Sequence, residues 1–316
     1  MKKSKMLFFF VVLLLFVFSN STFAAWPEKP INVIIPWLPA GDPSTIVCNA
    51  MSPLLTDELG VPVKILNKDG GGGIVGANEV ALSRPDGYTI GLLSIGPMVT
   101  QPLRGVTPYS IDDFRTLGLM WASPFTLAAR GDAPYDNLKE LAEYGKENEI
   151  KLGHYGLGAV PTLIAMNIAE KGGFNWNETA FSNIDALLLT RGDVDVVTCS
   201  TPALMDYIET GEVKILTVLS PTHYDCCPDV QTVSEQGFGN DYLIWFGLFM
   251  SKDVPDEIAD KFEEAWFKVM QNPEIKKALQ NVGVVVIEMP SDKAKEQIAM
   301  EVEVFGATMK RMGMIE

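Results

Sequence analysis

Short apolar runs alternate with amphipathic or turn-rich stretches along most of the chain. Ile31–Pro36, Val61–Leu66 and Tyr88–Ser94 are apolar runs bounded by prolines, glycines or turns, which is typical of buried strands. Helical patterns lie between them, one beginning near Ser44 as the expected N-cap and one through Ala77–Leu82. Strand–helix–strand order at this spacing predicts a parallel sheet with helices on its faces.

The same alternation restarts in the middle of the chain, which indicates a second block of the same class. No long linker separates the blocks, so we expect the chain to cross between them through short strands. In the second block, helices are expected at Leu138–Lys146, Val160–Lys171 and Pro202–Thr210, and strands at Lys151–Tyr155, Val194–Thr198 and Val213–Leu219. In the final block, strands are expected around Ile244–Met250 and at Val284–Ile287. Helices are expected to begin at Asp256 and at Ser291 and to cover Glu274–Asn281.

The first 25 residues resemble a secretory signal. Three lysines precede an apolar run from Leu7 to Phe18, and Thr22 and Ala24 occupy the −3 and −1 positions of a cleavage site. The alternative is a membrane anchor, but the run falls short of the ~20 residues that span a bilayer. We therefore expect residues 1–24 to be a signal peptide, cleaved near Ala24, and the mature protein to be periplasmic, with no segment inserted in the membrane.

The charge balance narrows the possible partners. The chain has 25 Lys and Arg against 40 Asp and Glu, a formal net charge of −15, and cleavage after Ala24 would remove three lysines and leave −18. Such a protein lacks the basic surface that nucleic-acid binding requires, and anionic membrane surfaces would repel it. The two histidines, His154 and His223, are too few for a multi-histidine metal centre. We expect no metal and no cofactor.

The chain contains four cysteines, Cys48, Cys199, Cys226 and Cys227. In an oxidising compartment one or two disulfides are possible, and the sequence does not fix their pairing. The adjacent Cys226 and Cys227 are either a redox element or an incidental loop pair. No C-x-x-C motif occurs, so neither zinc binding nor thioredoxin-like chemistry is indicated.

Known catalytic and nucleotide-binding motifs are weak or absent. Gly71, Gly73 and Gly76 formally complete G-x-G-x-x-G between a strand and a helix. A close backbone approach at a turn explains these glycines equally well. No G-x-S-x-G motif is present, and His154 or Cys199 would be the residues of a periplasmic enzyme, the less favoured alternative. We therefore do not expect an enzyme.

Two loops occupy equivalent positions in the two blocks. Pro36–Ser44 and Tyr155–Pro161 each contain small residues and each lead from a strand into a helix. Such loops expose backbone N–H groups at the positive end of the helix dipole. Two of them facing one another are suited to holding a small anion in a cleft.

A series of motifs resembles the solute-binding proteins of tripartite tricarboxylate transporters, the Bug or TctC family. Each motif is weak alone, but together they run in order from residue 26 to about 250. They are Trp26-Pro-Glu-Lys-Pro-Ile31 followed by Val33-Ile-Ile-Pro-Trp37, Asn67-Lys-Asp-Gly-Gly-Gly-Gly73 with Gly76-Ala77, Pro85-Asp-Gly-Tyr-Thr89, Gly192-Asp-Val-Asp195, Pro228-Asp-Val-Gln-Thr232 with Glu235 and Gly237, and Trp245-Phe-Gly247.

This resemblance implies an α/β, periplasmic-binding-protein-like (type II) Venus flytrap with two lobes joined by crossover strands. We expect lobe 1 to comprise residues 26–122 plus 222–316 and lobe 2 residues 123–221. The implied function is capture of a small organic carboxylate between the lobes and its delivery to a two-component membrane permease driven by an ion gradient. A ligand-loaded sensor that docks on a membrane kinase is the alternative in which transport is not involved.

The predicted ligand-binding residues combine the two loops with positions beside them. The sequence departs from the family pattern at Asp42-Pro43, where small residues are usual, at Ser44 and Cys199, where an aspartate is usual, and at Thr179–Asn183, where a lysine is lost. The missing aspartates argue against an amino-acid ligand, and the missing lysine argues against a highly charged tricarboxylate. The sequence leaves open which carboxylate is bound. The predicted site is Trp37, Pro39, Ala40, Gly41, Ser44, Ser94, Ile95, Tyr155, Gly156, Gly158, Ala159, Phe181 and Ser200.

Overall fold

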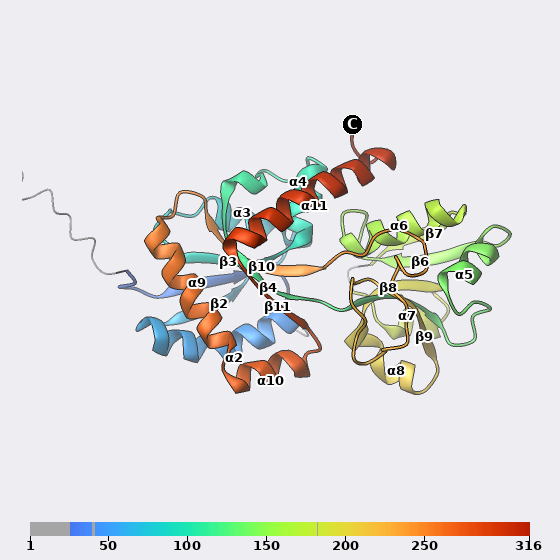
Figure 1. The fold of residues 1–316 in the computed structure, drawn as a ribbon, viewed down its shortest axis with the longest axis horizontal. Coiled ribbons are helices and arrows are strands. Elements are labelled where there is room, and N and C mark those ends of the chain that lie inside the picture. The colour runs from blue at the N-terminus through green and yellow to red at the C-terminus, as the bar shows by residue number, and fades with distance from the viewer. Residues whose placement is uncertain (1–25, 40–41, 182) are drawn as a thin grey trace, which may run out of the picture.

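A computed structural model describes residues 26–39, 42–181 and 183–316, which form two sheets covered by helices (Figure 1). The predicted signal peptide, and Ala40 and Gly41 of the first loop, lie outside the described residues. Over the described ranges, no helix combines the length and the apolar character needed to cross a membrane.

The first sheet has six strands in the order β11-β4-β10-β3-β1-β2. Strand β1 pairs in parallel with β2 and β3, whereas β10 runs antiparallel to β3 and β4. The strands are β1 (Ile31–Ile35), β2 (Val63–Asn67), β3 (Thr89–Ser94), β4 (Phe114–Ala122), β10 (Trp245–Ser251) and β11 (Val285–Pro290). The helices on this side are α2 (Pro43–Leu59), α3 (Ile74–Ala81), α4 (Gln101–Leu103), α9 (Asp256–Met270), α10 (Pro273–Asn281) and α11 (Ser291–Arg311), and a π-helical turn, η2 (Gly96–Thr100), precedes α4.

The second sheet repeats this arrangement with five strands in the order β7-β6-β8-β5-β9. Strand β6 pairs in parallel with β7 and β8, and β5 runs antiparallel to β8 and β9. The strands are β5 (Phe125–Arg130), β6 (Ile150–His154), β7 (Trp176–Ala180), β8 (Val196–Ser200) and β9 (Val213–Val218). The helices are α5 (Leu138–Gly145), α6 (Val160–Gly172), α7 (Ala186–Thr190) and α8 (Met205–Glu209).

The chain crosses between the sheets twice, from β4 to β5 and from β9 to β10. The segment 222–243, which the sequence placed in lobe 1, makes hydrogen bonds to the second sheet. The Tyr224 hydroxyl donates to the Phe125 carbonyl (3.2 Å), and the Gln236 side-chain amide donates to the Leu216 carbonyl (2.9 Å). The lobe boundaries stay a proposal, and these bonds move the proposed second boundary to about residue 243.

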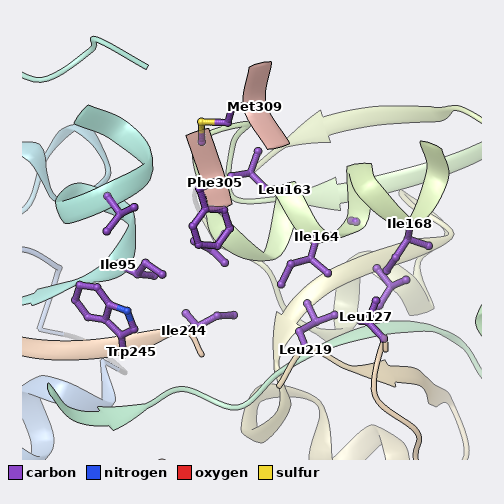
Figure 2. Packing of buried hydrophobic residues seen from close by; sticks show 14 of the residues in the cluster. Ile95, Leu127, Leu163, Ile164, Ile168, Leu219, Ile244, Trp245, Phe305 and Met309 are labelled. Atoms are coloured by element: carbon purple, nitrogen blue, oxygen red, sulfur yellow. The ribbon is translucent and has the colours of Figure 1, made fainter. Parts of the chain in front are cut away.

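One hydrophobic cluster joins the two halves of the molecule. Ile95 and Trp245 of the first half belong to the same buried cluster as Leu127 and Ile164 of the second. Figure 2 shows Phe305 and Met309 of α11 beside Leu163 of α6. The Arg311 guanidinium then donates to Asn167 (2.6 Å) and Glu170 (3.2 Å) at the end of the seam. Helix α11 therefore ties the first lobe to the second.

Candidate functional site

The two predicted loops follow parallel strands at equivalent positions in the two sheets. Strands β1, β2 and β3 end at one edge of the first sheet, on the side that faces the second lobe (Figure 1). In parallel sheets, the crevice outside the carboxyl ends of the strands is where ligands bind. A buried hydrogen bond from the Thr100 hydroxyl to the Gly158 carbonyl (2.5 Å) connects this edge to the loop after β6. The turn after β3 therefore meets the loop after β6 at the seam between the lobes.

The first loop ends differently from the prediction, because Asp42 rather than Ser44 is the N-cap of α2. The Asp42 carboxylate accepts hydrogen bonds from the Thr45 backbone N–H and hydroxyl, both at 2.7 Å. Asp followed by a proline at the first helical position is a strong start signal. Ser44 lies inside the first turn and is buried. The N-terminus of α2 is thus already occupied by a carboxylate of the chain itself.

Trp37 and Pro39 lie on the part of the first loop that the structure describes. The Trp37 ring packs against Gly73 and Pro97, since a Cβ built on Gly73 would meet the ring at 2.9 Å and Pro97 at 3.1 Å. The absence of a side chain at Gly73, which has φ +97°, permits this close approach. Within the described residues the Trp37 indole N–H is buried without a hydrogen-bond partner. Pro39 is exposed.

The second loop leaves the N-terminus of its helix without a side-chain cap. The N-cap of α6 is Ala159, whose side chain accepts no hydrogen bond. Gly156 adopts φ +95°, a conformation that glycine tolerates best, and its N–H donates to Nδ1 of His154 (2.9 Å). Nε2 of His154 is hydrogen-bonded to Glu178. His154 therefore shapes the loop, with both ring nitrogens engaged inside the second lobe.

Gly158 lies at the contact between the lobes. A Cβ built there would come within 2.8 Å of the Arg104 guanidinium and 3.6 Å of the Gln101 side chain. Gln101 also donates to the Gly72 carbonyl (3.0 Å), and so links the glycine-rich turn to the same seam. Among the described residues, Arg104 has no ion-pair partner within 4.0 Å.

The other predicted residues lie at different depths. Tyr155 is 37% exposed, and its ring meets Phe125 edge-on at 5.9 Å between centroids. Ser94 and Ile95 are buried, and Ile95 packs in the cluster of Figure 2 rather than facing open space. Phe181 packs partly buried against a smaller core of the second lobe, and Ser200 is partly exposed at the end of β8.

Cys199 has no features of a nucleophile. Its thiol is fully buried and donates to the Ile184 carbonyl (3.2 Å). Burial raises the pKa of Cys199 to about 12 and also raises the pKa of the neighbouring Tyr155 hydroxyl. Because the thiolate is the reactive form, this cysteine stays protonated and inert at neutral pH. Among the described residues, no group of three or more His, Cys, Asp or Glu is placed to hold a metal ion.

Two surface hollows lie away from the loops. One, of about 530 Å³, is lined by Lys29, Arg84 and Tyr88 among others, near the amino ends of β1 and β3. The other, of about 430 Å³, is lined by Lys139 and Tyr144 of α5 and nearby residues. Neither contains a residue of the predicted site.

The prediction from sequence left out Asp42, Thr100 and Arg104. Asp42 carried a signal, because an N-cap aspartate before Pro43 marks the start of a helix. Thr100 and Arg104 carried none: they follow a strand by six and ten residues, and only the approach of the second lobe brings them to Gly158.

The family model described as "Tripartite tricarboxylate transporter family receptor" (TctC) matches residues 48–314. A UPF0065 protein of Bordetella pertussis is 32% identical over 280 residues, which cover 86% of each chain. The structure of the periplasmic binding protein BugD is 28% identical and superposes with a TM-score of 0.75, over 92% of this chain and 99% of BugD.

A further structure has the same fold at lower identity. MatC from Rhodopseudomonas palustris, determined with bound malate, is 22% identical, with a TM-score of 0.77 over 90% of this chain and 99% of MatC. The expected two-lobed, periplasmic-binding-protein-like α/β class is thus confirmed. The chain belongs to the TctC receptor family of tripartite tricarboxylate transporters, a family of periplasmic solute-binding proteins.

Proposed function

We propose that this protein is exported after cleavage near Ala24, captures a small organic carboxylate between its lobes and delivers it to a two-component membrane permease. The observation that supports it most directly is the N-terminus of α6. This 13-residue helix begins at Val160 with no side-chain cap, at the seam where Thr100 of the first lobe contacts Gly158. Unpaired backbone N–H groups at the positive end of a helix attract a carboxylate.

The surroundings of this helix end favour an anion. Arg104 reaches Gly158 from the first lobe, and the described residues give its guanidinium no carboxylate partner. The overall charge of the protein is strongly negative, so long-range steering does not help an anion to bind. Capture would therefore depend on these local groups.

A thermal-shift screen tests the proposal. The purified mature protein is melted with a panel of monocarboxylates, dicarboxylates, hydroxy acids, amino acids and aromatic acids. Malate is included because MatC, a protein of the same fold, was determined with it bound. A ligand at 100 times its Kd stabilises the native state by about 2.7 kcal/mol, which gives a clear rise in Tm.

The expected result is that at least one carboxylate raises the Tm, with isothermal titration confirming one site per chain. Mass spectrometry of the supernatant after denaturation shows whether an acid co-purifies and masks the shift. A protein that is free of ligand and yet responds to no acid would contradict the proposal.

A further inference from the structure

The carboxylate of Asp42 occupies the place where the first lobe would otherwise bind an anion. It accepts hydrogen bonds from the backbone N–H and the hydroxyl of Thr45, at 2.7 Å each. Backbone N–H groups at the start of a helix are those that hold a bound anion. At α2 these groups are satisfied from within the chain.

A network of neutral groups fixes Asp42 at the edge of the first sheet. The Asn67 side-chain amide, at the end of β2, donates to the Thr45 hydroxyl (2.8 Å) and to the Trp37 carbonyl (2.9 Å). All of these donors are uncharged, and no lysine or arginine of the described residues lies within 4.0 Å of the Asp42 carboxylate. Burial raises its pKa, which is the expected effect on a carboxylate with no cation beside it.

Asp42 also retains the capacity to bind a donor from outside the chain. An ionised carboxylate has about four acceptor positions, of which the Thr45 N–H and hydroxyl use two, both on Oδ2. The residue is partly exposed and directly precedes α2. Acceptor positions are therefore available to a hydroxyl or ammonium group.

The opposite side of the seam has the reverse character. Helix α6 has no side-chain cap, and the Arg104 guanidinium lies against Gly158 just before it. In the first turn of α6, the fully buried Thr162 hydroxyl has no hydrogen-bond partner among the described residues. The start of α6 thus offers unpaired donors, with the Arg104 guanidinium of the first lobe beside it, whereas the start of α2 already holds a carboxylate.

From this asymmetry we infer that Asp42 sets the ligand class: a molecule with one carboxylate and, at its other end, a hydroxyl or amino group. The carboxylate binds at α6, and the hydroxyl or ammonium group donates to Asp42. A dicarboxylate of the same length would bring a second negative charge to Asp42, whose nearest groups in the chain do not neutralise it. This inference rests on the proposed function and specifies the substrate class of the same site.

Matched ligands that differ only at one end test this inference. Isothermal titration compares adipate with 6-hydroxyhexanoate and 6-aminohexanoate, and succinate with 4-hydroxybutyrate and 4-aminobutyrate. For whichever chain length fits, the wild-type protein is expected to bind the hydroxy or amino acid at least tenfold more tightly than the diacid.

The variant Asp42→Asn keeps a good N-cap residue, so α2 should remain folded, and it removes the charge. It is expected to abolish the tenfold preference, mainly by tightening diacid binding. Asp69→Asn is the matched control, because it removes one negative charge from an exposed position in the loop after β2. Asp42→Ser, which also caps the helix, replaces Asp42→Asn in the binding measurements if the Asn variant has a low Tm.

Each outcome has a definite meaning. A wild-type preference for the diacid, or an equal change in preference in the Asp42 and Asp69 variants, would overturn the assignment to Asp42 while leaving carboxylate capture intact. Absence of binding by every acid, in protein free of co-purified ligand, would instead overturn the proposed function and this inference together.

Discussion

The two strand–helix loops have the same place in the two sheets but opposite electrostatic character. The loop after β1 ends in Asp42, which caps α2 with a carboxylate, whereas the loop after β6 ends in Ala159, which leaves α6 uncapped. Equivalent topology therefore does not imply equivalent ligand contacts. The loop after β6, which retains unsatisfied N–H groups, is the better site for an anion. The loop after β1, where Asp42 satisfies the N–H groups of the helix, is better suited to bind a hydrogen-bond donor.

The largest expected effect comes from filling the contact between the lobes. In Gly158→Leu, the added side chain must displace Arg104 and Gln101, whose atoms lie 2.8 and 3.6 Å from the Cβ position. We expect ligand affinity to fall about 100-fold, equivalent to roughly 3 kcal/mol, by isothermal titration, with the circular dichroism spectrum unchanged.

Gly158→Ala is the matched control, because only the flexible end of Arg104 has to move. If the Leu variant bound as tightly as the wild type, the second loop would not belong to the site.

A buried acid away from both loops is expected to control stability rather than binding. Glu301 on α11 is 2% exposed and accepts hydrogen bonds from Trp245 (2.6 Å) and Gln297 (2.8 Å). Burial raises the pKa of Glu301 to about 7. The folded state then binds its proton more tightly than the unfolded state, so stability falls as pH rises from about 4.5 to 7.

Glu301→Gln should remove that slope and increase the free energy of unfolding at pH 8 by up to roughly 3 kcal/mol. Urea denaturation at pH 5 and pH 8 measures the change. Glu296→Gln, at an exposed position of the same helix, is the control and should leave the slope in place. A slope identical in the wild type and the Glu301 variant would contradict the prediction.

Moving a carboxylate to the second loop tests the comparison directly. Ala159 has φ −79° and ψ 136°, the extended conformation of an N-cap residue. Ala159→Asp should stabilise the ligand-free protein by about 1 kcal/mol and weaken carboxylate binding about tenfold, as followed by Tm and titration.

Ala159→Ser adds a cap without a charge, so it separates competition for the N–H groups from charge repulsion. Unchanged affinity in the Asp variant would show that the anion binds elsewhere.

The smallest expected effect concerns the hydrogen bond between the Thr100 hydroxyl and the Gly158 carbonyl across the seam. Thr100→Val leaves the buried Gly158 carbonyl without this donor and should cost about 1 kcal/mol. We also expect an increase in the radius of gyration of the ligand-free protein by small-angle X-ray scattering, as the lobes separate. Thr107→Val removes a hydrogen bond to Tyr109 within the first lobe and should leave the radius unchanged. Equal behaviour of the two variants would argue against a bond that holds the lobes together.

The sequence predicts secondary structure well where a short apolar run, bounded by turn residues, marks a strand or helix by itself. The strands at β1, β3 and β6 and the helix at α6 lie within a few residues of their expected limits. The sequence does not predict the strands β4, β5 and β7 or the helix α7. The strands β4 and β5 lack a clear alternation of apolar and polar residues, and only Ser123-Pro124 separates them. Their separation depends on the chain leaving one sheet and entering the other.

By itself, the sequence determined the α/β class, the two-block organisation, the family and the two loops at equivalent strand ends. These features follow from short-range periodicity and motifs. Only the tertiary structure decided that Asp42 caps α2, that Ile95 lies in the core, and that Thr100 and Arg104 meet Gly158. The physical reason is that capping geometry and contacts between lobes depend on how distant segments approach in space, which no local pattern of residues encodes.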